Sequence, residues 1–138
     1  MTTLVVDASV AAAIEIVAQR TDAVMKLIAT WDEYEPVAPF VFNLETPWLL
    51  LKRERRYALG GFARRALGNL SRLLIDVYPA PDAGALSLAF DVAERNGLGL
   101  YDAHYLLLAL ETGGVLATKD SGLIRAAGVF GIDVLDVR

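Results

Sequence analysis

With 138 residues the chain has the length of one domain, and its 55 % hydrophobic content is enough for a large core and for an apolar surface that binds a partner. No apolar run approaches the roughly 18 residues of a membrane span, and the amino terminus lacks the features of a signal peptide. The absence of cysteine excludes disulfides and thiolate metal sites, and together these features predict a cytoplasmic protein that does not bind membranes. The net charge of −4 argues against a general polyanion binder, although a local basic surface remains compatible with it.

Strand-like and helix-like patterns alternate along the chain. The apolar residues Leu4 to Val6 end in Asp7, which is typical of a strand buried on both faces, and a helix is expected from Ser9 to about Ala18. Pro47 lies inside a helical pattern, so that helix either begins late, near Asn43, or is kinked. Further strands are expected at 37–38, 75–78, 115–118 and 132–137, and further helices after 21–22 and at 62–74, 82–95, 100–112 and 121–127.

This alternation implies βαβ units and a parallel sheet. We find no internal repeat, low-complexity tract or linker in the sequence. The chain is therefore expected to form a single α/β domain over residues 1–138.

Four acidic residues lie among apolar neighbours, namely Asp7, Glu45, Asp102 and Asp120. Acidic side chains are rarely buried without partners, so this placement requires an explanation. Asp7 and Asp120 follow strands and should lie at the same edge of a parallel sheet, while Asp102 falls in the first turn of a helix. Clustered carboxylates repel one another unless cations neutralise them, and their oxygens suit Mg²⁺ or Mn²⁺. Such a cluster is suited to phosphodiester hydrolysis by metal-activated water.

Each acid also has a purely structural interpretation. Asp7 is placed to cap a helix, and Asp102 to interact favourably with the dipole of its own helix. Asp120 stands in a turn sequence, and nothing in the spacing around Glu45 is diagnostic. The residues alone leave both interpretations open.

Basic residues are concentrated between positions 52 and 72. This segment holds seven of the thirteen lysines and arginines, with Glu54 as the opposing acid. A phosphate backbone could bind there, but a solvated helix face or a surface for an acidic protein would have the same composition. The residues assigned to nucleic-acid binding are Lys52, Arg53, Arg56, Arg64 and Arg65.

Three segments carry a resemblance to a known family. Val5-Val6-Asp7-Ala8-Ser9 looks like its opening motif, residues 101–106 (Tyr-Asp-Ala-His-Tyr-Leu) like its most recognisable segment, and residues 116–120 (Leu-Ala-Thr-Lys-Asp) like a later strand end. In this order the chain resembles PIN domains, and among them the VapC toxins of bacterial and archaeal toxin–antitoxin pairs. Glu45 stands where the second acid of that family does.

The resemblance implies a three-layer sandwich with a central parallel sheet, and a metal-dependent endoribonuclease. Carried over by position, Asp7, Glu45, Asp102 and Asp120 would bind Mg²⁺, or Mn²⁺, and activate water. The hydroxyls of Ser9 and Thr118 would orient these acids or a phosphate. The implied partners are an RNA substrate, a cognate antitoxin and a second copy of the chain, and the apolar run Trp48 to Leu51 is a candidate surface for the latter two.

Other interpretations compete with this one. A PIN-like scaffold would bind RNA or protein without cutting it, and DNA is an alternative substrate because metal chemistry does not distinguish the sugars. A phosphotransfer domain with Asp7 as phosphoacceptor lacks the expected order of acids, and a DxD-type phosphatase is excluded by Ser9. His104, the single histidine, lies about 200° around the helix from Asp102, so we expect a buried or interface position for it.

Overall fold

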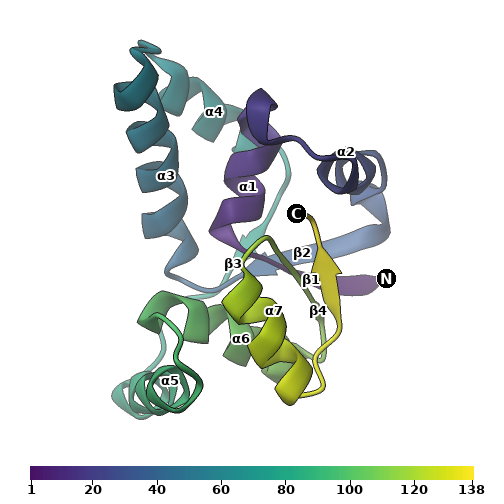
Figure 1. Ribbon diagram of the computed structural model, residues 1–138, viewed down its shortest axis with the longest axis vertical. Coiled ribbons are helices and arrows are strands. Elements are labelled where there is room, and N and C mark those ends of the chain that lie inside the picture. The colour runs from purple at the N-terminus through teal and green to yellow at the C-terminus, as the bar shows by residue number, and fades with distance from the viewer.

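The computed structural model describes residues 1–138 and has a central sheet between two layers of helices (Figure 1). All neighbouring strands are parallel, in the order β3-β2-β1-β4-β5. The expected α/β class and three-layer architecture are therefore confirmed. The strands are β1 (Thr2–Val6), β2 (Tyr34–Ala38), β3 (Asp76–Val77), β4 (Val115–Thr118) and β5 (Val134–Asp136).

The helices lie on both faces of the sheet. Figure 1 shows α1 to α4 on one side and α5 to α7 on the other, with α3 and α4 forming an arm that extends away from the sheet. The helices are α1 (Ala8–Glu15), α2 (Asp22–Ala29), α3 (Phe42–Tyr57), α4 (Phe62–Ser71), α5 (Ala83–Asn96), α6 (Leu100–Thr112) and α7 (Ser121–Val129), with short 3₁₀ turns η1 (Val17–Gln19) and η2 (Trp31–Glu33). None of them is both long and apolar enough to cross a bilayer.

Strand β1 is the centre of the sheet. Leu4, Val5 and Val6 are completely buried, because helices cover both faces and the strand has a neighbour on each side. Strand β2 pairs with one side of β1, and β4 pairs with the other. The chain thus changes direction across the sheet at β1, and in such folds a crevice forms beyond the carboxyl ends of the strands at this point. Asp7 is the next residue after β1.

The elements differ from the expected ones mainly at their ends. β2 begins at Tyr34 rather than at Val37, because Tyr34 and Glu35 pair with the exposed beginning of β1, where polar side chains face water. Helix α1 stops at Glu15, before η1, and α7 continues two residues further, to Val129. The outer strands β3 and β5 are shorter than expected.

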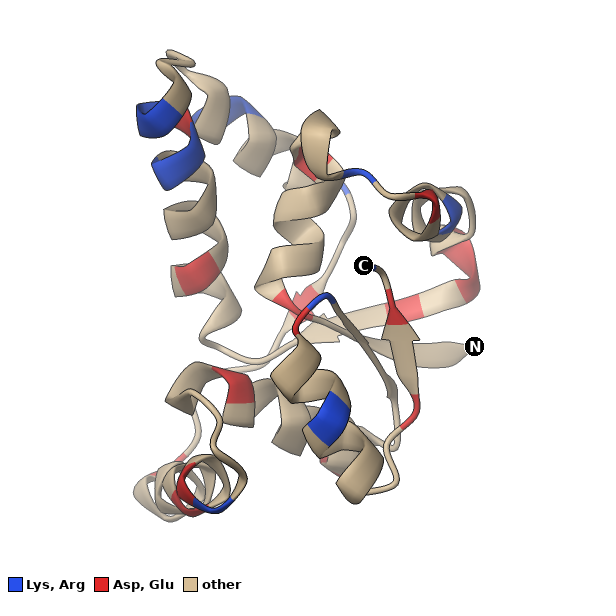
Figure 2. Ribbon diagram, in the orientation of Figure 1, with Lys and Arg blue, Asp and Glu red and all other residues tan.

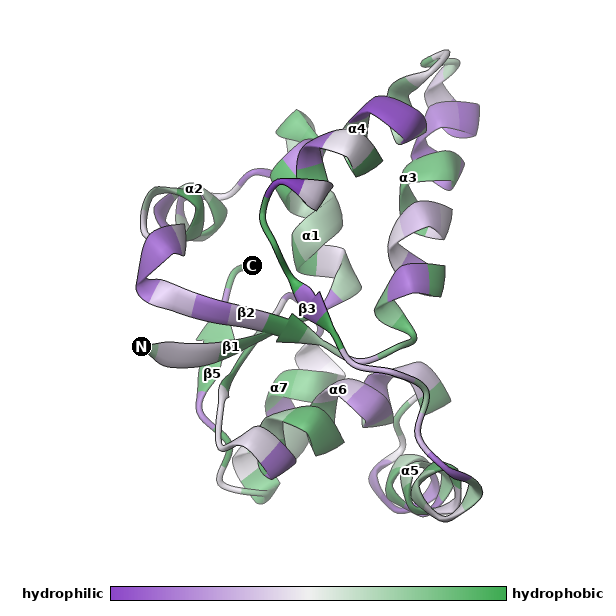
Figure 3. Cartoon of the chain, turned by 180° about the vertical axis from the view of Figure 1, so that it is seen from behind, coloured by the Kyte–Doolittle hydropathy of each residue, from purple (hydrophilic) through white to green (hydrophobic).

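Helix α3 begins at Phe42, which agrees with the late start predicted from Pro47, and continues unbroken to Tyr57. The proline lacks the N–H that would bond to the carbonyl of Asn43, but Asn43 is exposed, so water can reach that carbonyl. The expectation that Trp48 to Leu51 forms a partner surface is wrong for Leu50, which is completely buried in the core. Trp48 alone of this run is exposed. Seen from behind, α3 and α4 also carry hydrophilic stretches (Figure 3).

Candidate active site

Asp7 is a buried carboxylate held by two hydroxyl groups. It precedes α1, but its side chain makes no capping hydrogen bond to that helix. Instead, Oδ2 accepts hydrogen bonds from Ser9 Oγ and from Thr118 Oγ1, each at 2.8 Å. Burial raises the pKa of Asp7, against the effect of these two hydrogen bonds, and the negative charge of Asp120 raises it further. The structural interpretation of Asp7 as a side-chain cap of this helix is therefore excluded.

Thr118 connects two of the acidic positions. Its hydroxyl donates to Asp7 and accepts a hydrogen bond from the backbone N–H of Asp120 at 3.0 Å. Asp120 caps α7, because its Oδ1 accepts a hydrogen bond from the N–H of Leu123 at 2.8 Å. Asp120 is exposed, and its second oxygen has no hydrogen-bond partner within the protein.

Asp102 reaches the same edge of the sheet because of the direction of its helix. Only Gly113 and Gly114 separate α6 from β4, so α6 runs back along the sheet and its first turn lies beyond the carboxyl ends of the strands. Gly113 permits this tight connection through a left-handed backbone, with φ of 65°. Burial, and then the charges of Asp7 and Asp120, raise the pKa of Asp102 to about 6.

Glu45 extends from the first turn of α3 towards these acids. Burial is the largest cause that raises the pKa of Glu45 to about 7, and the charges of Asp7 and Asp102 contribute to the rise. Its Oε1 atom is buried without a hydrogen-bond partner of good geometry. The four acids therefore influence one another electrostatically although they come from four separate segments of the chain.

The carboxylates do not form a preassembled metal site, since no three acidic or histidine side chains are close enough together to hold an ion. Their chemistry nevertheless fits a divalent cation. They supply hard oxygen donors, two of them have pKa values raised to about 6 and 7, and one buried carboxylate oxygen lacks a partner. A bound cation would relieve both the repulsion and the burial of negative charge.

Tyr105 belongs to the site, although the sequence did not indicate a role for it. The residue is completely buried, and its hydroxyl, like Glu45 Oε1, lacks a partner of good hydrogen-bond geometry. The two groups are nonetheless close enough to interact: the Tyr105 hydroxyl lowers the pKa of Glu45, while burial and then the Glu45 charge raise the pKa of Tyr105. The backbone N–H of Ala8, beside Asp7, acts in the opposite direction and lowers the pKa of Tyr105. A tyrosine three residues after Asp102, on nearly the same face of α6, was the available signal.

His104 lies away from the acids, as expected. It is buried, its ring packs edge-on against Phe40 with 5.0 Å between centroids, and burial lowers its pKa. A buried ring packed against Phe40, with no interaction with the four acids, is a structural residue rather than a general base.

The assigned basic residues lie on the arm formed by α3 and α4, where Figure 2 shows several blue segments. None of them forms an ion pair. The one salt bridge of the molecule joins Arg138 to Asp136. Glu54, the acid among them, accepts a hydrogen bond from the N–H of Ala63 instead. A hollow of about 580 Å³ between α1 and α3 is lined by Ser9 and by Lys52, Arg53 and Arg56. It therefore links the hydroxyl that binds Asp7 to three of the cations.

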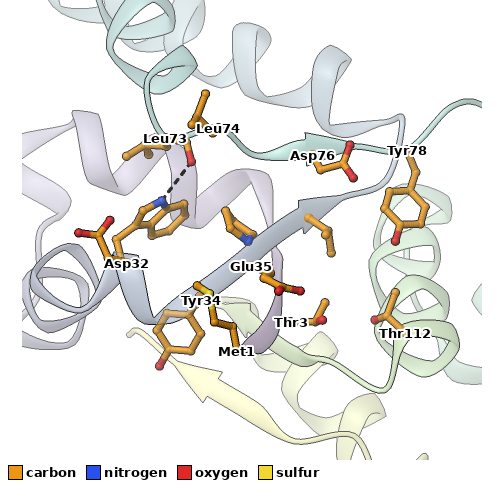
Figure 4. Close-up of a pocket in the computed structure, with 13 residues that line it drawn as sticks. Met1, Thr3, Asp32, Tyr34, Glu35, Leu73, Leu74, Asp76, Tyr78 and Thr112 are labelled. Carbon is orange, nitrogen blue, oxygen red and sulfur yellow. Dashed lines mark hydrogen bonds between the residues drawn. The ribbon is translucent and has the colours of Figure 1, made fainter.

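A larger hollow lies elsewhere in the molecule. It has a volume of about 780 Å³ and is lined by residues such as Thr3, Trp31, Tyr34 and Asp76 (Figure 4). The dashed line in the figure marks the hydrogen bond from the Trp31 indole N–H to the Leu73 carbonyl, at 3.1 Å. None of the four acids lines this hollow, so we do not regard it as the active site.

Comparisons with known proteins assign the chain to a family. The model of the PIN domain matches residues 4–129, so the chain belongs to the PIN-domain family, whose members are generally nucleases that use a divalent metal. No curated protein matches the chain.

Three solved structures are similar to the whole chain. PAE2754 from Pyrobaculum aerophilum is 25 % identical with a TM-score of 0.69, and the match covers 97 % of this chain and 90 % of that one. FitAcB from Neisseria gonorrhoeae is 18 % identical with a TM-score of 0.58, covering 95 % of each chain. A domain of a functionally unknown protein from Methanocaldococcus jannaschii is 18 % identical with a TM-score of 0.59, covering 100 % and 92 %. The latter two support the fold alone.

Proposed function

We propose that this protein is a divalent-metal-dependent endoribonuclease and the toxin of a VapC-type toxin–antitoxin pair. The observation that carries the proposal is the placement of four acids beyond the carboxyl ends of the strands: Asp7 and Asp120 follow β1 and β4 and are joined through Thr118, and Glu45 and Asp102 lie in the first turns of α3 and α6. The family assignment and the resemblance of residues 101–106 to VapC toxins favour the same activity.

In the proposed mechanism Asp7 and Asp102 are the main ligands of Mg²⁺ or Mn²⁺, and Glu45 and Asp120 complete the set directly or through water. When bound, the metal supplies a hydroxide from water and stabilises the charged oxygens of the cleaved phosphodiester. Ser9 and Thr118 hold the Asp7 carboxylate in one orientation. The capping bond of Asp120 engages one of its oxygens and leaves the other free for a ligand.

The substrate strand would lie in the hollow between α1 and α3. Lys52, Arg53 and Arg56 line this hollow, so they would contact phosphates of the strand beyond the cleaved bond. Arg64 and Arg65 on α4 would extend the basic surface. The lack of acidic partners keeps these cations available for phosphate oxygens. A cognate antitoxin in the cytoplasm would block this surface, and we expect the toxin to form a homodimer.

The test is cleavage of structured and unstructured RNAs, and of DNA, by purified protein with Mg²⁺, Mn²⁺ or EDTA. Asp7→Asn keeps the shape of the side chain but removes its charge, and Asp91→Asn, at an exposed position of α5, is the matched control. We expect metal-dependent cleavage of RNA by the wild type and by Asp91→Asn, and a loss of about 100-fold or more in Asp7→Asn, the order expected for removing a ligand or its support. Cleavage in EDTA, or a fully active Asp7→Asn variant, would contradict the mechanism.

A cellular experiment separates the toxin from the non-catalytic scaffold. Expression of the wild type without a partner should arrest growth, and Asp102→Asn should abolish the arrest. Co-expression of a small protein encoded immediately upstream should also restore growth. Normal growth at confirmed high expression of the wild type, with RNA bound but uncut, would favour the scaffold.

A further inference from the structure

A second, smaller hollow lies next to the candidate active site. It has a volume of about 330 Å³, and its six lining residues include Glu45, Trp48, Lys52 and Tyr101. Glu45, Trp48 and Lys52 are spaced three and four residues apart, so they lie on one face of α3. Tyr101 comes from the first turn of α6, directly before Asp102. The hollow therefore adjoins two of the four acids.

The two aromatic residues of this hollow are unusually exposed. Trp48 is 50 % and Tyr101 45 % exposed, although burial of such large rings normally contributes to the core. Both rings lie at the surface close to an acid of the candidate site: Trp48 is three residues after Glu45 on α3, and Tyr101 directly precedes Asp102 on α6. Their position is thus more useful for a ligand than for the stability of the fold.

Positive charge surrounds the indole ring. Lys52 Nζ lies 5.6 Å and the guanidinium carbon of Arg55 5.9 Å from the centre of the Trp48 ring, and neither cation has an acidic partner. Aromatic faces beside unpaired cations form the usual surface for single-stranded nucleic acids, in which bases stack on the rings and phosphates bind the cations.

We propose that Trp48 and Tyr101 form a nucleobase site that binds an unpaired base of the RNA, next to the phosphodiester at the acids, with Lys52 on the neighbouring phosphate. This inference rests on the proposed function and specifies its substrate as single-stranded RNA. In a duplex the bases are stacked on one another and paired, so their faces cannot reach Trp48. The volume of the hollow suits one small planar group.

A protein partner is the competing occupant, because aromatic residues are also common in protein interfaces. The unpaired cations Lys52 and Arg55 beside the Trp48 ring favour RNA here. Binding of a protein at Trp48 is one outcome of the experiment below.

Fluorescence of Trp48 tests the proposal directly. The chain has two tryptophans, so Trp31→Phe leaves Trp48 as the single emitter, and Asp7→Asn in the same protein prevents cleavage. The probes are a short single-stranded oligoribonucleotide, the same sequence in a duplex, and an abasic strand of equal length. We expect the single strand to quench Trp48 and to bind roughly tenfold more tightly than the other two probes, the effect of about one stacked base.

Variants then assign the effect to the two rings. In the Asp7→Asn background, Trp48→Ala and Tyr101→Ala should each weaken binding of the single strand roughly tenfold, measured by fluorescence anisotropy of a labelled oligonucleotide, and Trp48→Phe should weaken it less. Phe90→Ala, which removes a 58 % exposed ring on α5, is the control and should bind normally. Melting temperatures establish that each variant is folded.

Equal binding of the abasic strand, or unchanged binding by Trp48→Ala, would overturn the nucleobase site. A Trp48→Ala variant that binds RNA normally but fails to dimerise would assign the surface to a protein and overturn it too. Failure of the proposed function has a different signature: the wild type cuts no RNA, while Trp48 still responds to the single strand.

Discussion

Replacing Glu45 by glutamine should stabilise the metal-free protein above neutral pH. Burial, together with the charges of Asp7 and Asp102, raises the pKa of Glu45 from 4.5 to about 7. At about 1.4 kcal/mol per pH unit, this rise corresponds to roughly 3 kcal/mol. Because Glu45 is only partly buried, solvent screening reduces the expected effect to about 1–2 kcal/mol.

The direction of the effect follows from proton binding. Below about pH 4.5 Glu45 is protonated in both the folded and the unfolded chain, and it has no influence. Between pH 4.5 and 7 the unfolded chain releases this proton while the folded chain keeps it, so the free energy of unfolding falls as the pH rises. Above pH 7 Glu45 is charged in the folded chain as well, so the full cost of burying this charge lowers the free energy of unfolding. The uncharged glutamine of Glu45→Gln avoids this cost.

Urea denaturation in EDTA at pH 4 and pH 8 measures this difference. Glu45→Gln should match the wild type at pH 4 and exceed it by about 1–2 kcal/mol at pH 8. Glu94→Gln, at an exposed position of α5, should match the wild type at both. Added Mn²⁺ at pH 8 should raise the free energy of unfolding of the wild type by more than it raises that of the Glu45→Gln variant, because the variant lacks one carboxylate ligand. If Glu45→Gln were no more stable than the wild type at pH 8, Glu45 would not be a buried charge near other acids, and its place in the site would be refuted.

Three further predictions address the core and the surroundings of the acids. Leu50→Ala should lower the free energy of unfolding by about 2–5 kcal/mol, because Leu50 is completely buried. A loss below about 1 kcal/mol in urea denaturation would contradict the core position of Leu50. Tyr105→Phe should weaken Mn²⁺ binding in calorimetry, because it removes the hydroxyl that faces Glu45; unchanged affinity would show that this hydroxyl does not position the carboxylate. His104→Phe should keep full nuclease activity and a normal pH profile, because the ring packs against Phe40 and takes no part in proton transfer; loss of activity in a folded variant would argue for a catalytic histidine.

The sequence determined the elements and the kind of chemistry. The apolar residues of β1 before Asp7, the alternation of patterns and the two glycines after α6 each have a local cause, so the parallel α/β fold was predictable. The helix at 100–112 and the strand at 115–118 agree with the structure residue by residue. The acids were identifiable because carboxylates among apolar residues are costly without a partner.

Only the tertiary structure decided how these residues meet. Asp7 accepts hydrogen bonds from Ser9, two residues away, and from Thr118, 111 residues away. No local pattern encodes the second of these contacts. Leu50 appeared to be surface because the sequence does not reveal which face of α3 meets the core. The interaction of Tyr105 with Glu45 likewise depends on how α6 packs against β1 and on where α3 begins. Local patterns set the propensity of each segment, but the burial and the contacts of a side chain depend on segments that are distant in the chain.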